Sequence, residues 1–174
     1  MVSGDGTRIA YHVLGAGPPL VLLFPYHVND LIRNWSVPVH REAIRDLAQH
    51  FTVITLALRG AGQSERTPGE LTLDALCGDV LAVLGDAGFD RTGVLAIGSI
   101  ALVAARLSVS FPAAVSALVL LGAGESDTSD RLLRLRGISP AIGSDVRATA
   151  VVGLADRENV AALAEVIREA TSPT

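Results

Sequence analysis

Apolar runs of strand length alternate along this chain with segments of helical periodicity, and this alternation limits the folds open to it. The runs that have the length and composition of strands are Thr7–Leu14, Pro19–Pro25, Phe51–Leu58, Gly93–Ile97, Val115–Leu121 and Ala148–Gly153. The later runs are nearly continuous in valine, leucine and isoleucine, as strands covered on both faces must be. The pattern predicts an α/β domain with a mostly parallel sheet, helices on both faces and the first strand antiparallel at an edge.

Helical stripes lie between these runs. The first stripe consists of Ala43, Ile44, Leu47, Ala48 and Phe51. The second runs from Leu73 to Leu84, with Thr72 as its N-cap and Gly88 as its stop. A third helix follows Ser99 and ends near Pro112. A fourth is predicted over Arg157–Ala170 with Asp156 as its N-cap, while the polar, glycine-rich Gly122–Asp145 segment is predicted to be a loop with one or two helical turns.

Length and composition indicate one domain over residues 1–174. The chain has 174 residues, of which 49% are hydrophobic and 18% charged, so we expect a large core or an apolar surface that meets a partner. A homodimer is therefore expected. The net charge of −4, without a cluster of lysine or arginine, argues against nucleic acid and against anionic membranes as partners.

The single cysteine and the N-terminal residues indicate the cellular compartment in which the protein is expected. Cys77 excludes an internal disulfide framework and a multi-cysteine metal site, and its place on an apolar helical stripe predicts a core residue. The N-terminus has no cationic segment followed by an apolar run, and no apolar stretch reaches the roughly 18 residues of a membrane span. We expect a cytoplasmic protein.

Specific residues add a family resemblance to this pattern. "YHVLGAGPPLVLL" is similar to the second and third strands of an α/β-hydrolase, "LRGAGQS" to its D-x-R-G-x-G-x-S turn, and "FPAAVSALVLLGA" to its return strand. The chain most resembles the hydrolase-like domains attached to bacterial cyclases and transcriptional regulators. The resemblance covers Asp5–Ala123 and, more loosely, Val146–Ala170. It implies an α/β-hydrolase-like fold that lacks the helical cap and the last strand, and both losses favour a homodimer.

The same resemblance locates the turn that carries the family's nucleophile. The slots of G-x-S-x-G fall in order on Ala96, Ile97, Gly98, Ser99 and Ile100. Gly98 then occupies the nucleophile slot, and the Ser99 hydroxyl is expected to satisfy a backbone N–H at the start of the helix. A register shifted by one residue would make Ser99 the nucleophile, but it would crowd the turn with Ile97; the unshifted register has its own misfit, at Ile100.

The remaining members of the triad are also incomplete by this comparison. "GLAD", Gly153 to Asp156, matches the family's acid position, yet no histidine follows His50 to serve as a base, and Ala57 replaces the aspartate of the D-x-R-G turn. A serine without a base is not deprotonated near neutral pH. The resemblance therefore implies loss of Ser-His-Asp hydrolysis, with Asp156 a helix cap.

Ligands of open parallel sheets bind beyond the carboxyl ends of the strands, so the turns there hold the candidate site. Tyr26 and His27 could donate hydrogen bonds to a ligand carbonyl, with Asp30 orienting the histidine, or they could be a space-filling ring and a solvated loop residue. Gly98, Ser99 and Glu125 complete the predicted ligand site. No spacing among the histidines and acids forms a metal site, and no glycine-rich turn forms a phosphate cradle, so no cofactor is expected.

These observations leave three functional hypotheses. In the first, the chain binds a small apolar molecule, with or without non-hydrolytic acid/base chemistry such as cyclisation or elimination by Tyr26 and His27. In the second, it is a non-catalytic dimerising or sensory scaffold. In the third, it is an atypical serine hydrolase that uses Ser99.

Overall fold

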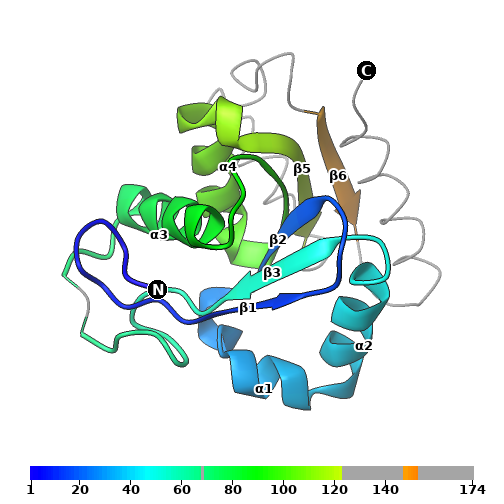
Figure 1. Cartoon of the computed structure of the whole chain (residues 1–174), viewed down its shortest axis with the longest axis horizontal. Coiled ribbons are helices and arrows are strands. Elements are labelled where there is room, and N and C mark those ends of the chain that lie inside the picture. Colours follow the sequence, from blue (N-terminus) through cyan, green and yellow to red (C-terminus); the bar gives the residue numbers. More distant parts are fainter. Residues whose placement is uncertain (68, 123–146, 153–174) are drawn as a thin grey trace.

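A six-stranded sheet forms the centre of the computed structural model, which describes residues 1–67, 69–122 and 147–152 (Figure 1). The strand order is β1-β3-β2-β4-β5-β6. The strands are β1 (Tyr11–Leu14), β2 (Pro19–Leu23), β3 (Thr52–Leu56), β4 (Thr92–Ile97), β5 (Val115–Gly122) and β6 (Arg147–Val152). Among these described strands only β1 pairs antiparallel, along β3 at the edge, and the other pairings are parallel. The predicted α/β class and mostly parallel sheet are confirmed.

Helices cover both faces of the sheet, as Figure 1 shows. On one face α3 (Leu73–Asp86) and α4 (Ala101–Ser110) bury their apolar sides against Val21, Ile54 and Val94. On the other face α2 (Pro38–Leu47) packs against Leu20, Val53 and Leu95, with α1 (Leu31–Ser36) beside it. Successive strand residues alternate between these two cores because the strand period is two.

The N-terminal strand is shorter than predicted. The ladder of β1 begins at Tyr11 rather than at Thr7. The preceding residues fold back on the chain's own beginning instead, where Ser3 N donates to Thr7 O at 2.8 Å and Ile9 N donates to Met1 O at 3.0 Å. This local turn satisfies backbone groups that the predicted longer strand would have paired with the sheet.

The connection from β2 to β3 contains two helices where the sequence predicted one. The unpredicted α1 begins at Asp30, whose carboxylate accepts from Arg33 N at 2.8 Å, and it ends at the extended Val37 that precedes Pro38. Pro38 then opens α2. Phe51, predicted on the helical stripe, lies beyond the end of α2 and is buried in the turn before β3.

The second predicted helix is confirmed in detail. Thr72 caps α3 by accepting from Ala75 N at 3.2 Å, and Gly88 follows the helix with a φ of 84°, the left-handed geometry that glycine adopts without strain. Cys77 is fully buried within it, and burial raises the pKa of its thiol to about 11. A core role for Cys77 is confirmed.

Several predictions lie outside the described residues. They concern Glu125, the loop after β5, Asp156 and the helix over Arg157–Ala170. In the part of the chain that is described, no helix is both long enough and apolar enough to cross a membrane.

Candidate functional site

The turns after β2 and β4 form the candidate site, because these strands are neighbours in the sheet. Leu23 of β2 lies opposite Ala96 of β4, so the residues that follow each strand emerge at the same edge. Tyr26 and His27 stand in the 3-10 turn Tyr26–Val28, and Gly98 and Ser99 in the 3-10 turn Gly98–Ile100. The fold thus brings four of the predicted site residues to one edge of the sheet.

Gly98 makes the sharp turn out of β4. Its φ is 64°, whereas no non-glycine residue of the described chain has a positive φ. Ser99, one position later, is exposed, and its hydroxyl has no hydrogen-bond partner among the residues described. Helix α4 takes Ile100 as its N-cap without a side-chain bond, so the predicted capping role of Ser99 is wrong.

Tyr26 is held by a neighbouring turn. Its hydroxyl donates to the backbone carbonyl of Arg59 at 2.9 Å, and the residue is 37% exposed. This bond connects the turn after β2 to the turn after β3. It also uses the single proton that the tyrosine could donate to a ligand, so the oxygen is left as an acceptor.

His27 is not oriented by Asp30, contrary to the expectation from their spacing. The Asp30 carboxylate accepts from Arg33 N and, at 3.0 Å, from the Gln63 side-chain amide. The Arg33 bond is the main cause of the lowered pKa of Asp30. His27 is exposed and has no hydrogen bond in the described part of the chain. The Asp30 carboxylate therefore caps α1 instead of orienting His27, and the spacing of the two residues in the sequence could not reveal this.

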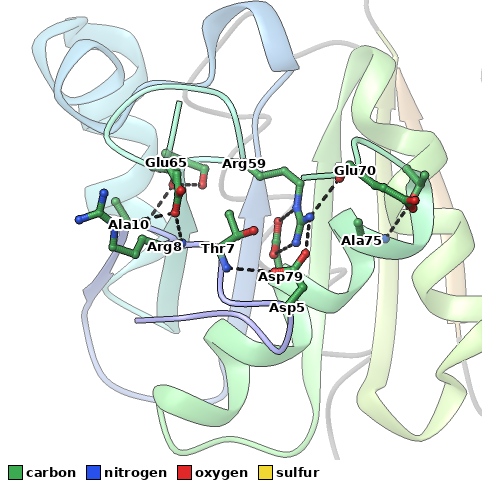
Figure 2. A network of polar contacts seen from close by, with 12 residues as sticks. Asp5, Thr7, Arg8, Ala10, Arg59, Glu65, Glu70, Ala75 and Asp79 are labelled. Carbon is green, nitrogen blue, oxygen red and sulfur yellow. Dashed lines mark hydrogen bonds and ion pairs between the residues drawn. The ribbon is translucent and has the colours of Figure 1, made fainter. Parts of the chain in front are cut away.

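A buried ion pair that the sequence analysis did not predict lies beneath the turn after β3 (Figure 2). The Arg59 guanidinium is 1% exposed and contacts both oxygens of Asp79, which is 0% exposed, at 2.7 and 2.6 Å. Its Nη1 also donates to Asp5 at 2.7 Å and to the carbonyl of Glu70 at 3.0 Å. These bonds raise the pKa of Arg59, and the hydrogen bond from Arg59 is the main cause that lowers the pKa of Asp5 to about 2.

This Arg59 cluster (Arg59, Asp79 and Asp5) is structural in its geometry. It joins the N-terminal turn, the turn after β3 and α3, and every charged group in it has a partner. One sequence signal could have located it: Asp79 falls between Leu76 and Val80 on the buried side of a helix, where an unpaired carboxylate would be costly. Its arginine partner, 20 residues away, is visible only in three dimensions.

Two buried neutral side chains complete the support beneath the site. Ser64 accepts from Ala10 N at 2.9 Å and donates to Ala57 O at 2.6 Å, and Asn29 bonds both Phe24 O and Leu58 N. The Asn29 bonds join the turns after β2 and β3 on either side of Tyr26, whereas the Ser64 bonds join the turn after β3 to the residue before β1. Within the described ranges no group of three histidine, cysteine or acidic side chains could hold a metal ion.

Comparisons with known proteins agree with this geometry. No protein-family model matches the chain. The soluble epoxide hydrolase of Corynebacterium sp. (strain C12) is 34% identical over 91 residues, which are 52% of this chain and 29% of that enzyme. The solved structure of an α/β hydrolase from Sphaerobacter thermophilus matches with a TM-score of 0.62 at 17% identity, covering 98% of this chain and 88% of the other. This chain has the α/β-hydrolase fold.

The chain spans less than half the length of the curated relatives it matches. An uncharacterized protein of Mycobacterium tuberculosis is 29% identical over 143 residues, which are 82% of this chain and 40% of that protein. The strand-to-helix turn predicted to correspond to the nucleophile turn of α/β-hydrolases has Gly98 at its sharpest point, with a φ of 64°.

Proposed function

We propose that this α/β-hydrolase-fold protein does not hydrolyse substrates through a serine at its nucleophile elbow, the strand-to-helix turn at Gly98. We also propose that it binds a small apolar molecule at the carboxyl edge of its sheet. The observation that carries the first part is the φ of 64° at Gly98. In this fold the nucleophile occupies the strained turn so that its side chain projects above the sheet. A glycine at that position offers no attacking atom.

The surroundings of Ser99 support the same conclusion. A serine nucleophile needs a base within hydrogen-bond reach to remove its proton. The Ser99 hydroxyl bonds to no described residue, and His27, the histidine on the adjacent turn, has no hydrogen bond to it. Ser99 also has an ordinary backbone conformation rather than the strained one.

The binding part of the proposal is supported by what the two turns expose. His27 and Ser99 present polar groups without partners among the described residues, and Tyr26 presents its ring and an acceptor oxygen. A neutral ligand suits them, because the Arg59 charge is already paired with Asp79 and the Asp30 carboxylate already accepts hydrogen bonds from Arg33 N and Gln63. In this proposal His27 is the group that could move a proton in non-hydrolytic chemistry. Glu125, predicted for the same site, lies outside the described residues.

One observation favours a second candidate, an atypical serine hydrolase. Ser99 is exposed beside the elbow, so a base from elsewhere could reach its hydroxyl. Labelling with a fluorophosphonate probe separates the two candidates. We expect no labelling of the wild-type protein. Labelling that is lost in Ser99→Ala but kept in Ser36→Ala, an exposed serine on α1, would overturn the proposal.

The ligand site is tested by NMR titration of the ¹⁵N-labelled protein with styrene oxide, a neutral apolar epoxide chosen because a relative is an epoxide hydrolase. We expect shift changes at Tyr26–Val28 and Gly98–Ile100, and weaker binding in His27→Ala. His50→Ala, an exposed histidine far along the chain from these turns, is the control. Saturable changes confined to other residues, or none, would contradict this site.

A further inference from the structure

A cavity lies away from the strand-end turns, between the β1–β3 edge of the sheet and helices α1 and α2. Its volume is about 440 Å³, within the range of small-molecule sites. The residues that line it include His12 of β1, Thr55 of β3, Phe24 after β2, and Asn34 and Trp35 of α1. None of Tyr26, His27, Gly98 or Ser99 lines it. We refer to it as the Trp35 cavity.

Two buried polar side chains of the Trp35 cavity have no hydrogen-bond partner. Asn34 is 4% exposed and Thr55 is 5% exposed, and neither side chain bonds to any described residue. By contrast, the buried hydroxyls of Thr52 and Thr92 each donate to a backbone carbonyl at 2.8 Å. Within the described residues, the fully buried side-chain polar atom that lacks a partner is His40 Nδ1, so the polar atoms of Asn34 and Thr55 instead open onto the cavity. A bound molecule can therefore reach both groups, and neither is already occupied by a bond within the chain.

The remaining walls indicate the chemistry of that partner. They are mostly apolar, with Phe24, Leu31, Ile44 and the Trp35 indole, and the lining contains no aspartate, glutamate, lysine or arginine. Two contacts hold Trp35 in place. Its ring meets the His12 ring edge-on, with 5.8 Å between the ring centroids, and the Arg45 guanidinium lies 5.3 Å from the centroid of the indole. An apolar cavity with a few convergent hydrogen-bonding groups is the usual design of a small-molecule site.

We propose that the Trp35 cavity binds a neutral, largely apolar molecule that carries a carbonyl or carboxamide group. The carboxamide of Asn34 and the hydroxyl of Thr55 both donate and accept, so they can pair with a carbonyl oxygen and with an amide N–H. A charged ligand is disfavoured because the lining holds no aspartate, glutamate, lysine or arginine to neutralise it. This site is independent of the one proposed at Gly98, since the two share no lining residue.

The chain carries its own reporter for the test. Trp35 is its single tryptophan, so one indole N–H resonance in the ¹⁵N spectrum reports on this cavity. We expect benzamide to shift that resonance saturably, benzoate to bind at least tenfold more weakly, and the Tyr26–Val28 turn to stay unperturbed. An indole resonance that benzamide leaves unchanged, or that benzoate shifts equally well, would overturn the proposal.

Variants separate a binding role from a structural one. Thr55→Val and Asn34→Leu each remove one hydrogen-bonding group and should weaken benzamide binding about tenfold without lowering the thermal midpoint. Ile32→Glu places a charge at the exposed rim and should also weaken binding, whereas Val39→Glu, equally exposed on α2 but outside the cavity, should not. Equal affinity in wild type, Thr55→Val and Ile32→Glu would refute the site, even if Asn34→Leu failed to fold.

Discussion

The Arg59 cluster and the Asn34–Thr55 pair are both buried and polar, yet their hydrogen bonding differs. Arg59 lies on the α3 side of the sheet and bonds two carboxylates and a carbonyl. Asn34 and Thr55 lie on the α1 side, line a cavity and bond nothing in the described chain. Burial alone therefore does not distinguish a structural polar group from a binding one, whereas the presence or absence of partners does.

The energetics of the two sets follow from that difference. Removing one member of a paired, buried ion pair leaves an uncompensated charge in the interior. Removing a polar group that has no partner leaves nothing unsatisfied and can even stabilise the fold. The following variants test how far this contrast holds, from the largest expected effect to the smallest.

Arg59→Met should be the most damaging change. It leaves Asp79 buried without a partner, and breaking a buried ion pair in this way costs about 3–5 kcal/mol of unfolding free energy. Urea unfolding followed by circular dichroism measures the loss. Arg106→Met, which breaks the exposed Arg106–Asp74 pair, is the matched control and should cost far less, because solvent screens an exposed ion pair. Similar losses in both variants would show that burial does not control the cost.

Ser64→Ala should have an intermediate effect. The buried hydroxyl bonds Ala10 N and Ala57 O, and both backbone groups would lose a partner, at a cost of about 1–3 kcal/mol. Thermal unfolding by calorimetry measures the change. Ser36→Ala removes an exposed hydroxyl bonded to Arg33 O and should change stability much less. An unchanged midpoint for Ser64→Ala would mean that the turn after β3 does not depend on these bonds.

Asp5 should make stability depend on pH in acid. Its pKa is lowered from 3.8 to about 2 by Arg59, so the folded protein binds fewer protons than the unfolded chain. The stabilisation is present above pH 4 and is lost as the pH falls from about 4 to 2. Urea midpoints measured at pH 5 and at pH 2.5 should therefore differ less in Asp5→Asn than in the wild type. An identical difference in both proteins would exclude this role.

Thr55→Val should have the smallest effect on stability. The hydroxyl has no hydrogen-bond partner among the described residues to lose, so the free energy of unfolding, measured by calorimetry, should stay within about 0.5 kcal/mol of wild type or rise. Thr52→Val is the matched control: its hydroxyl donates to Gly17 O, and its loss should destabilise by about 1 kcal/mol. A larger loss of unfolding free energy for Thr55→Val than for Thr52→Val would contradict the expectation that a hydroxyl without a partner contributes less to stability than a hydrogen-bonded one.

Local signals predicted the parts of the fold that depend on local physics. The apolar runs located the strands to within a few residues, because covered strands must be apolar. Thr72 and Gly88 fixed the limits of α3 through capping geometry. The helix α1 was missed because its six residues carry no apolar stripe that stands out, and its start depends on Asp30, which had been assigned to His27.

For the candidate site too, local features were predictable from the sequence and long-range contacts were not. The count of residues through the turn after β4 placed Gly98 at the sharp turn, and its φ of 64° agrees with that register rather than with the one shifted to Ser99. The partners of Tyr26 and Asp79 were beyond the reach of sequence spacing, because each lies on an element distant along the chain: 33 residues separate Tyr26 from Arg59. Asp30 bonds locally instead, to Arg33 N three residues away, as the cap of a helix that the sequence did not predict.

The sequence by itself determined the class of fold and the sharp turn at Gly98, a residue without a side chain, since periodicity, capping and glycine are local properties of the chain. Only the tertiary structure decided which polar groups are paired. Arg59 and Asp79 meet because β3 and α3 pack together, and Asn34 and Thr55 remain without partners because α1 lies over the edge of the sheet and leaves a cavity there. Hydrogen bonding across such distances depends on how the elements pack.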